Sequence, residues 1–379
     1  MKKLLIASAV SAAFAAPATA LAQQARVPTL SQVLDASGVS VSGYIDAGYS
    51  YANRNIGAPG GFTDRAFDSQ NNSFSLHQFG LTVSKTPKEG FGGLVNITAG
   101  SDAQLIHSFP ETTASTFDLT QAYGQYATGA LTLMAGKFTT LAGTEVIAST
   151  GNLNFSRSIL FTAVPLTHTG VRASYAPTDT ITLYGGVNNG WDQLTDGNKG
   201  KTLELGATLN PLKPLTVTVT GYFGQESAAA GVAGAPGGTQ TGTGPQGTRD
   251  MIDAVANYII SNSMSVGAEV LYVTQDNTAV GKAKYNGAAG YFTYTLNSQW
   301  RATARAEMFD DKNGFHFNTA PTGVKYREGT VTLAYMPTSS VELRGEVRRD
   351  QANNAVFVNS DGTTSKSLMT LGLQGIYKF

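Results

Sequence analysis

Apolar and polar side chains alternate at every second position from residue 38 to the C-terminus, in segments of about 9–13 residues. In the stretch KTLELGATLN (201–210), the leucines and Ala207 fall on one face, and Glu204 and the threonines fall on the other. The stretches PLTVTVTGYF, QWRATARAEMF and SVELRGEVRR repeat this pattern. A period of two residues is that of a β-strand, and the 3.6-residue period of a helix is nearly absent. The chain is therefore predicted to be all-β.

The connections between these segments decide between two all-β architectures. A soluble sandwich buries the apolar face, whereas a membrane barrel turns it outward to lipid and places the polar face in the lumen. Short turns and long loops follow one another along this chain, as in outer-membrane barrels. The short turns lie at 86–90, 128–129, 177–180, 211–214, 261–263, 297–299 and 338–340, and the long loops at 52–71, 101–116, 139–167, 190–199, 225–248, 275–282, 311–323 and 352–364. The sequence thus predicts a transmembrane antiparallel β-barrel of about 16 strands, within a range of about 14–18.

The first 22 residues, MKKLLIASAVSAAFAAPATALA, have the features of a secretory signal peptide. Two lysines precede a short apolar stretch, and Ala20-Leu21-Ala22 offers the small-x-small cleavage pattern. A transmembrane helix would need about 20 apolar residues, and the sequence contains no such run. We expect residues 1–22 to be the signal peptide, 23–37 a short periplasmic segment, and 38–379 a barrel in the outer membrane of a Gram-negative cell.

Composition argues against several kinds of function. Charged residues make up 14% of the chain, and 26 basic residues balance 26 acidic ones, so a nucleic-acid partner is not expected. Without cysteine there are no disulfides, thiolate nucleophiles or cysteine-ligated metals. The four histidines have none of the spacings typical of a metal site, and GTGPQG (242–247) lies in a low-complexity loop rather than between a strand and a helix. We therefore expect no metal and no cofactor.

One predicted loop differs from the others. Residues 139–167 form a long, moderately apolar connection between the fifth and sixth strands, and such connections in compact proteins are usually functional. Ile159, Leu160 and Phe161 need burial, which favours folding into the lumen over forming an external cap. The loop 225–248 is rich in Gly, Ala and Thr, and we expect it to be exposed and mobile.

Charged side chains gather on the polar face of the last strands. An arginine or lysine that faces lipid at the midplane costs about 2–4 kcal/mol, so these charges belong in a water-filled lumen. The predicted pore lining or constriction comprises loop and wall residues: Glu145, Arg157, Arg172, Arg301, Arg305, Glu307, Glu342, Arg344, Glu346 and Arg348. The wall residues could form a salt-bridged ladder, or a basic wall that faces acidic loop residues and orients polar solutes; both interpretations can hold together. Because the charges nearly balance, we expect weak or no ion selectivity.

Ser75 and His77 offer a catalytic alternative. Both point to the same face of a strand, and a serine with a neighbouring histidine base is the core of a hydrolase site. No third orienting group can be identified in the sequence, and two polar residues at the barrel rim explain the pair more simply. We predict that the protein is not an enzyme. A substrate-specific channel and a plugged structural barrel are further alternatives.

Three stretches resemble the outer-membrane β-barrel porin family: NNSFSLHQFGLTVSKTPKEGFGGLVNITAGSDA, QAYGQYATGALTLMAGKF and NFSRSILFTAVPLTHTGVRASYAPTDTITLYGGVNNGWD. The resemblance covers essentially the whole mature chain. It implies diffusion of small hydrophilic solutes, contact with outer-membrane lipid and lipopolysaccharide, and a homotrimeric assembly like that of general porins. General porins place a constriction loop between their fifth and sixth strands, so the resemblance implies this role for residues 139–167.

The chain ends in GIYKF, within the alternating pattern. The resemblance implies that Phe379 and Tyr377 form the signal read by the barrel assembly machinery, although Gln374 stands where such signals commonly have a glycine. By parity, Phe379 and Tyr377 face lipid and Lys378 faces the lumen. The last strand is expected to pair with the strand that starts at Val39, because lipid tolerates no open sheet edge.

Overall fold

The computed structural model describes residues 29–54, 65–68, 70–109, 115–227, 245–317, 319–359 and 361–379. The chain divides into two compact units, Met1–Val39 and Ser40–Phe379. In the described part of the first unit, Leu30–Ser37 form helix α1. The predicted signal peptide, residues 23–28 and the centre of the predicted loop 225–248 lie outside the described residues. No helix in the described ranges is long and apolar enough to cross a membrane.

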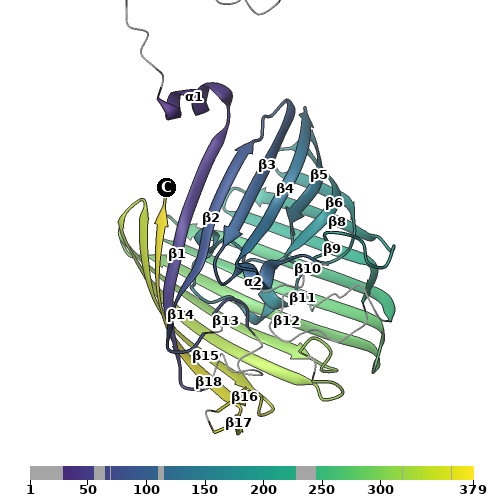
Figure 1. Ribbon diagram of the computed structural model, residues 1–379, viewed down its shortest axis with the longest axis vertical. Coiled ribbons are helices and arrows are strands. Elements are labelled where there is room, and N and C mark those ends of the chain that lie inside the picture. Colours follow the sequence, from purple (N-terminus) through teal and green to yellow (C-terminus); the bar gives the residue numbers. More distant parts are fainter. Residues whose placement is uncertain are drawn as a thin grey trace, which may run out of the picture. The chain divides into compact units, whose positions relative to one another are not determined.

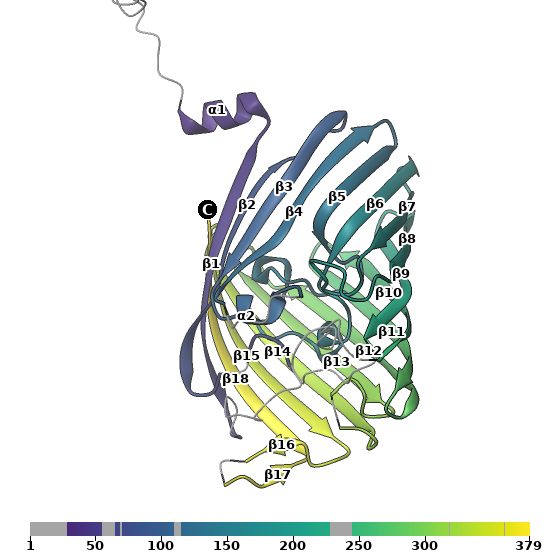
Figure 2. The same ribbon diagram turned by 45° about the vertical axis from the view of Figure 1, so that its right-hand side comes forward.

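The second unit is a closed antiparallel barrel, with sixteen strands among its described residues (Figures 1 and 2). Consecutive barrel strands are hydrogen-bonded to one another and the last strand pairs with the first, which confirms the predicted fold class. The barrel strands are β1 (Ser40–Ala52), β2 (Ser73–Lys85), β3 (Gly90–Ala99), β4 (Phe117–Thr128), β5 (Leu131–Thr139), β6 (Thr167–Thr178), β7 (Ile181–Asn188), β8 (Thr202–Leu212), β9 (Leu215–Ser227), β10 (Gln246–Ser261), β11 (Met264–Thr278), β12 (Gly281–Thr295), β13 (Trp300–Asp311), β14 (Val324–Thr338), β15 (Val341–Ala352) and β18 (Ser367–Lys378).

Three of the small elements in the described connections lie outside the segment between β5 and β6. Helix α2 (Ala103–Ile106) follows β3. Strands β16 (Phe357–Val358) and β17 (Thr364–Ser365) form a separate two-stranded sheet between β15 and β18.

Side-chain burial alternates along the strands in the sense expected of a membrane barrel. On β15, the charged residues Glu342, Arg344 and Glu346 are buried, whereas Leu343 and Val347 are 47% and 45% exposed. The same inversion runs through β8, β11 and β14. A soluble sandwich would bury its apolar side chains instead. The outward apolar face is therefore the surface that contacts lipid, and the polar face lines the interior.

The connections follow the predicted rhythm with one exception. All seven predicted short turns join neighbouring strands of the barrel. The prediction of a long loop at 275–282 is wrong, because β11 and β12 pair up to Thr278 and Gly281 and leave only residues 279–280 between them. Asn277 and Gly281 have φ values of 60° and 80°. This left-handed backbone closes the hairpin where the sequence suggested an open loop.

The first and last strands close the barrel, as predicted. β18 pairs with β1 along nine residue pairs, and beyond them Gly43 and Phe379 exchange both backbone hydrogen bonds at 2.9 Å. A Cβ at Gly43 would lie 2.5 Å from the Phe379 ring, so glycine leaves the space that the ring occupies at the seam. Tyr377 and Phe379 are 50% and 54% exposed on the outer face, and no sheet edge is open at this point.

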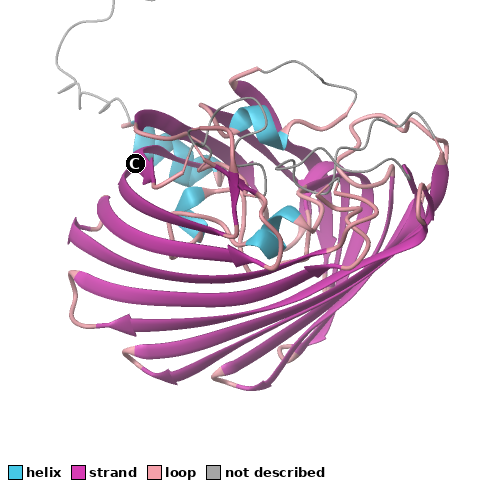
Figure 3. Ribbon diagram, turned by 90° about the horizontal axis from the view of Figure 1, so that it is seen from below, coloured by secondary structure: helices cyan, strands magenta, loops and turns pink. Residues whose placement is uncertain are grey.

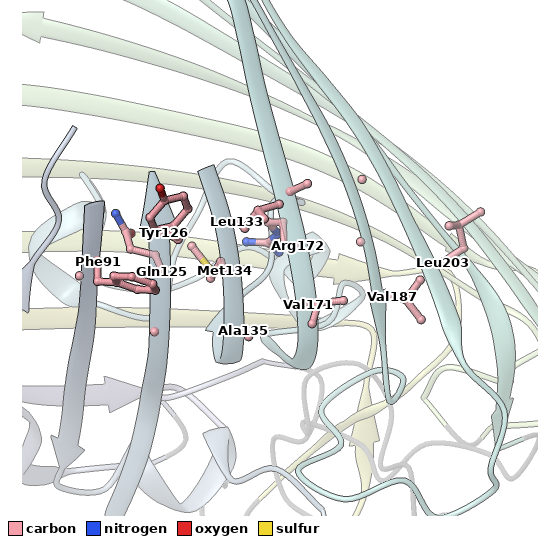
Figure 4. Close-up of a pocket in the computed structure, with 15 residues that line it drawn as sticks. Phe91, Gln125, Tyr126, Leu133, Met134, Ala135, Val171, Arg172, Val187 and Leu203 are labelled. Atoms are coloured by element: carbon pink, nitrogen blue, oxygen red, sulfur yellow. The ribbon is translucent and has the colours of Figure 1, made fainter. Parts of the chain in front are cut away.

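A groove of about 720 Å³ interrupts the outer apolar surface over β3–β8 (Figure 4). Phe91, Tyr126, Leu133, Val171 and Leu203 line it, and each of them is exposed on the outward face. Its floor is largely backbone, because glycines stand at positions 92, 124, 185 and 186. This groove belongs to the lipid-facing surface rather than to the lumen.

Candidate functional site

Residues 140–166, which connect β5 to β6 and are called the inner loop below, contact the inward-facing side chains of the barrel. Figure 3 shows short helices and loops within the curve of the strands. The inner loop contains the 3-10 turn η2 (Ser149–Gly151) and helix α3 (Ile159–Thr162). Ser158 caps α3 by accepting a hydrogen bond from the Phe161 N–H at 3.0 Å. All four residues of α3 are buried, and the helix packs against β12 and β13.

Two carboxylates hold the first part of the inner loop by its backbone. Asp253 on β10 accepts the Gly143 N–H at 2.9 Å, and Glu269 on β11 accepts the Thr144 N–H at 2.8 Å. In each carboxylate the second oxygen is buried and has no hydrogen-bond partner among the described residues. Among the described residues, no basic side chain forms an ion pair with either carboxylate. These two acids therefore serve as backbone anchors of the loop without a basic partner among the described residues.

Two further carboxylates hold the second part of the inner loop. Glu307 on β13 accepts the first two peptide N–H groups of α3, at 2.7 and 3.1 Å. Glu346 on β15 accepts the N–H groups of Phe155 and Ser156, at 2.7 and 3.0 Å. Hydrogen bonds to an ionised acceptor are about twice as strong as neutral ones. The wall thus fixes the loop through its peptide groups, which any loop sequence would offer.

Arginines of β15 bind the carbonyl oxygens of the same loop. Arg344 donates to the carbonyls of Asn152 and Asn154, at 2.7 and 3.1 Å. Arg348 donates to the carbonyl of Arg157, and its own position is fixed by an ion pair with Asp350 on the same strand. Wall glutamates thus accept hydrogen bonds from the N–H groups of this stretch of loop, and wall arginines donate hydrogen bonds to its carbonyl oxygens.

Glu145 and Arg157, the two charged loop residues predicted from the sequence, make different contacts. Glu145 Oε1 lies 2.6 Å from Nη1 of Arg305 on β13, and its Oε2 accepts the Ser158 N–H at 2.6 Å. Arg305 also pairs with Glu328 on β14, at 3.2 Å. Arg157 donates to three carbonyl oxygens of the loop itself, each at 3.0 Å. Glu145 joins the loop to the wall, whereas Arg157 fixes the loop's own shape.

The remaining predicted residues form ion pairs on the wall. Arg301 and Arg344 share Glu342, at 2.5 and 2.8 Å. Arg172 on β6 binds Glu204 on β8 through two contacts, at 2.5 and 2.8 Å. The first group is the salt-bridged ladder that the sequence suggested as one interpretation. Arg172 lies apart from it, so the structure does not bring all ten predicted residues together.

A cavity of about 390 Å³ lies between the inner loop and strands β1, β3, β4, β5, β8 and β9. On the barrel side it is lined by Asn96, Gln121 and several threonines, and on the loop side largely by apolar residues such as Val146 and Ile147. Glu145 is the one charged residue in the described lining, and its carboxylate oxygens bind Arg305 and Ser158. Most of the predicted charged residues hold the loop from its opposite side, and their role in a constriction stays a prediction.

His77 contacts the inner loop rather than a serine. Its Nδ1 lies 3.2 Å from Asp102 Oδ1, and its ring packs against Phe155 with 5.2 Å between centroids. A Cβ at Gly48 would lie 3.2 Å from His77 Nε2, so glycine makes room for the imidazole. No hydrogen bond joins Ser75 to His77 in the structure, and this geometry gives the catalytic alternative no support. Within the described ranges no three His, Asp or Glu side chains are placed to hold a metal ion.

His316 contacts the inner loop from the connection between β13 and β14. Its Nε2 lies 3.2 Å from the Thr162 hydroxyl of α3, and its ring packs against Tyr285 and Phe317 at centroid distances of 4.9 and 4.5 Å. Burial lowers the pKa of His316 to about 3, and the positive charge of Arg249 acts in the same direction. The imidazole is therefore neutral at pH 7.

Sequence reasoning did not identify two groups of residues in this region. Glu328 and Asp350 are buried partners of the wall arginines, and the alternation along β14 and β15 could have found them, since both share the inward parity of their neighbours. Asn96 and Gln121 line the cavity, but in the sequence they look like any polar residue of a strand. Only the docked position of the loop distinguishes them.

A family model described as "Putative beta-barrel porin-2, OmpL-like" matches residues 38–379. No curated protein matches this chain significantly. Similar solved structures include the outer membrane channel DcaP of Acinetobacter baumannii, with a TM-score of 0.61 and 15% identity, covering 90% of this chain and 97% of that one. The anion-selective porin from Comamonas acidovorans has a TM-score of 0.61 and 11% identity, covering 90% of this chain and 99% of that one. OprB of Pseudomonas putida has a TM-score of 0.58 and 14% identity, covering 92% of this chain and 96% of that one. At these identities the likeness establishes the fold alone.

Proposed function

This chain belongs to the OmpL-like family of β-barrel porins, and from that premise we propose that it is a passive channel for small hydrophilic solutes in the outer membrane. The observation that carries the proposal is the cavity of about 390 Å³ inside the barrel. Barrels of about 16 strands leave an aqueous channel, and a loop docked against one side narrows it without filling it. Transport through such a channel needs no catalytic group, because pore width and lining decide which solutes pass.

Weak ion selectivity is part of this proposal. Arg305 is paired with Glu145, Arg172 with Glu204, and these paired charges produce little net field along the pore.

The test is the current carried by the purified protein in a planar bilayer under a KCl gradient. We expect stepwise conductance and a reversal potential close to zero. A reversal potential that shows a strong preference for either anions or cations would reject the weak selectivity. Absence of any conductance, from protein shown to be folded by circular dichroism, would reject the channel itself.

We extend the proposal to assembly. Like general porins, the protein would form a homotrimer in lipid and lipopolysaccharide, with Phe379 and Tyr377 recognised by the barrel assembly machinery. Both aromatic side chains are half exposed and available to such a partner. Light scattering of the detergent-solubilised protein gives the number of subunits. Phe379→Ala should lower the amount of folded barrel in the outer membrane, and an unchanged amount would remove this residue from the signal.

A further inference from the structure

The cavity inside the barrel has two chemically different sides. The barrel side presents side-chain amides and hydroxyls from Asn96, Gln121 and five threonines on β3, β4, β5, β8 and β9, together with Tyr44 of β1. The loop side is largely apolar, and Val146 there is 45% exposed although it lies inside the barrel. No arginine or lysine is found among the described lining residues. Glu145 is the one charged residue in the described lining, and its carboxylate is bound to Arg305 and the Ser158 N–H, so a solute in this space meets no unpaired charge there.

Asn96 and Gln121 form a complementary hydrogen-bonding pair. They are directly opposite each other on β3 and β4. The Asn96 Nδ2 donates to the Leu81 carbonyl at 3.3 Å and to the Thr82 hydroxyl at 2.9 Å, so its Oδ1 is the free acceptor. Gln121 Oε1 accepts the Thr139 N–H at 3.3 Å, so its Nε2 is the free donor. Each amide orientation is fixed, because a carbonyl can only accept and a peptide N–H can only donate.

The threonines extend this neutral surface. Thr98 and Thr120 are hydrogen-bonded to each other at 2.8 Å, and Thr208 and Thr218 at 3.0 Å. A hydroxyl in such a pair keeps acceptor capacity for a further partner. Thr208 and Thr218 are only half-buried, so a solute can reach them. The barrel side can thus exchange hydrogen bonds with a solute hydroxyl or amide without offering it a compensating charge.

The docking of the inner loop keeps the apolar side in place. Val146 is tied to the loop through its N–H, which Asn152 accepts at 2.9 Å, while Asn152 is itself bound to Arg344 of the wall. The charged wall residues that bind the loop are absent from the described cavity lining, and the lining residue Glu145 is paired with Arg305 of the wall. The lack of an unpaired charge in the described lining therefore follows from the way in which the wall binds the loop.

We propose that this cavity is a selectivity site for uncharged solutes with hydroxyl or amide groups on one side and an apolar surface on the other. A neutral sugar has this chemistry. A charged solute would lose hydration at the site and gain no ion pair in return, which costs free energy. The proposal rests on the channel function proposed above and names its solute class.

The experiment is a swelling assay with liposomes that contain the full-length protein, using three probes of nearly equal size. Glucose is neutral, gluconate is its anionic analogue and glucosamine its cationic one. We expect glucose to enter at least several-fold faster than either analogue. Equal rates for all three, or a faster rate for gluconate or glucosamine, would overturn the inferred solute class. Because the same preparation is tested for conductance, a lack of conductance would instead reject the channel.

Variants at Gln121 connect the preference to the cavity. Gln121→Leu removes the free donor at nearly constant size and should slow glucose entry about two- to tenfold, the range that one hydrogen bond supplies. Gln121→Glu should raise the glucosamine rate relative to glucose. Gln125→Glu is the matched control, since this residue lies on the same strand and lumen face but does not line the cavity. If Gln125→Glu changes the rates as much as Gln121→Glu, or if Gln121→Leu changes nothing, the cavity is not the selectivity site.

Discussion

Glu145 of the inner loop and Arg305 of β13 form a buried ion pair, with 2.6 Å between Oε1 and Nη1. The two residues are 160 positions apart in the sequence, and the pair joins the loop to the far side of the barrel. Arg305 also pairs with Glu328, so one guanidinium binds two carboxylates. The position of the loop, and with it the width of the passage, depends on this arrangement.

Removing Arg305 should destabilise the barrel. Arg305→Met leaves Glu145 and Glu328 buried without this partner, and breaking a buried ion pair in this way costs about 3–5 kcal/mol. The free energy of unfolding in urea, measured in lipid vesicles, gives this cost. Lys325→Met is the control. The Lys325 side chain is 68% exposed, and its Nζ lies 3.4 Å from Asp310 Oδ2. Such surface ion pairs contribute about 1 kcal/mol or less. Similar losses for both variants would contradict the role assigned to Arg305.

The wall carboxylates should determine how far the loop narrows the channel. Glu307→Ala combined with Glu346→Ala removes four hydrogen bonds to the loop backbone. We expect larger and noisier single-channel currents, because the loop detaches from the wall while the strands of the barrel stay paired. Glu89→Ala is the matched control, since Glu89 accepts the Gly129 N–H in a turn outside the lumen. Currents identical to the wild type in the double variant would show that the loop does not limit the passage.

Charge on the outward face should be costly in proportion to its depth. Val331 is 59% exposed in the middle of β14, and Val331→Arg should destabilise the folded state by about 2–4 kcal/mol. Leu212 is equally exposed but lies beside a turn, where the same substitution should cost about 0–1 kcal/mol. Unfolding in lipid vesicles measures both values. Equal costs at the two positions would contradict the assignment of this face to lipid.

Acidification should loosen the contact between His316 and α3. The folded-state pKa of His316 is lowered to about 3 from an ordinary value near 6.5, so the unfolded state binds the proton more readily. The stability from the neutral ring is fully present above about pH 6.5 and is lost as the pH falls toward about 3. Hydrogen exchange of residues 312–317 should therefore accelerate between about pH 7 and about pH 4, after correction for the intrinsic rate. His316→Gln should reduce this pH dependence; an unchanged dependence would assign it to another group.

The fold could be predicted from the sequence because the two-residue period is a local property. Leu343 and Glu342 alternate in the sequence, and they alternate in space for the same reason. The seam at Phe379 followed from the need to leave no edge in lipid. The tight hairpin at Gly281 could not be predicted, because its closure depends on a left-handed backbone at Asn277 that other residues also adopt in loops.

The candidate site could be predicted only in part. Parity placed Arg305, Glu307 and Arg348 in the lumen, where the structure has them buried. Their partners are mostly peptide groups of the inner loop, which carry no signal in the sequence. The same limit applies to Asn96 and Gln121, which line a cavity only because the loop is docked against β13 and β15.

The most direct test of the central claim asks whether the aqueous passage runs between the inner loop and β4. The chain has no cysteine, so a single one can be introduced and labelled alone. We expect the single-channel current of Gln121→Cys to fall when a bulky, membrane-impermeant thiol reagent is added. Leu119→Cys, on the same strand and 44% exposed on the outer face before substitution, should keep its full current. No loss of current after complete labelling of Gln121→Cys, or an equal loss for Leu119→Cys, would contradict this path for the channel.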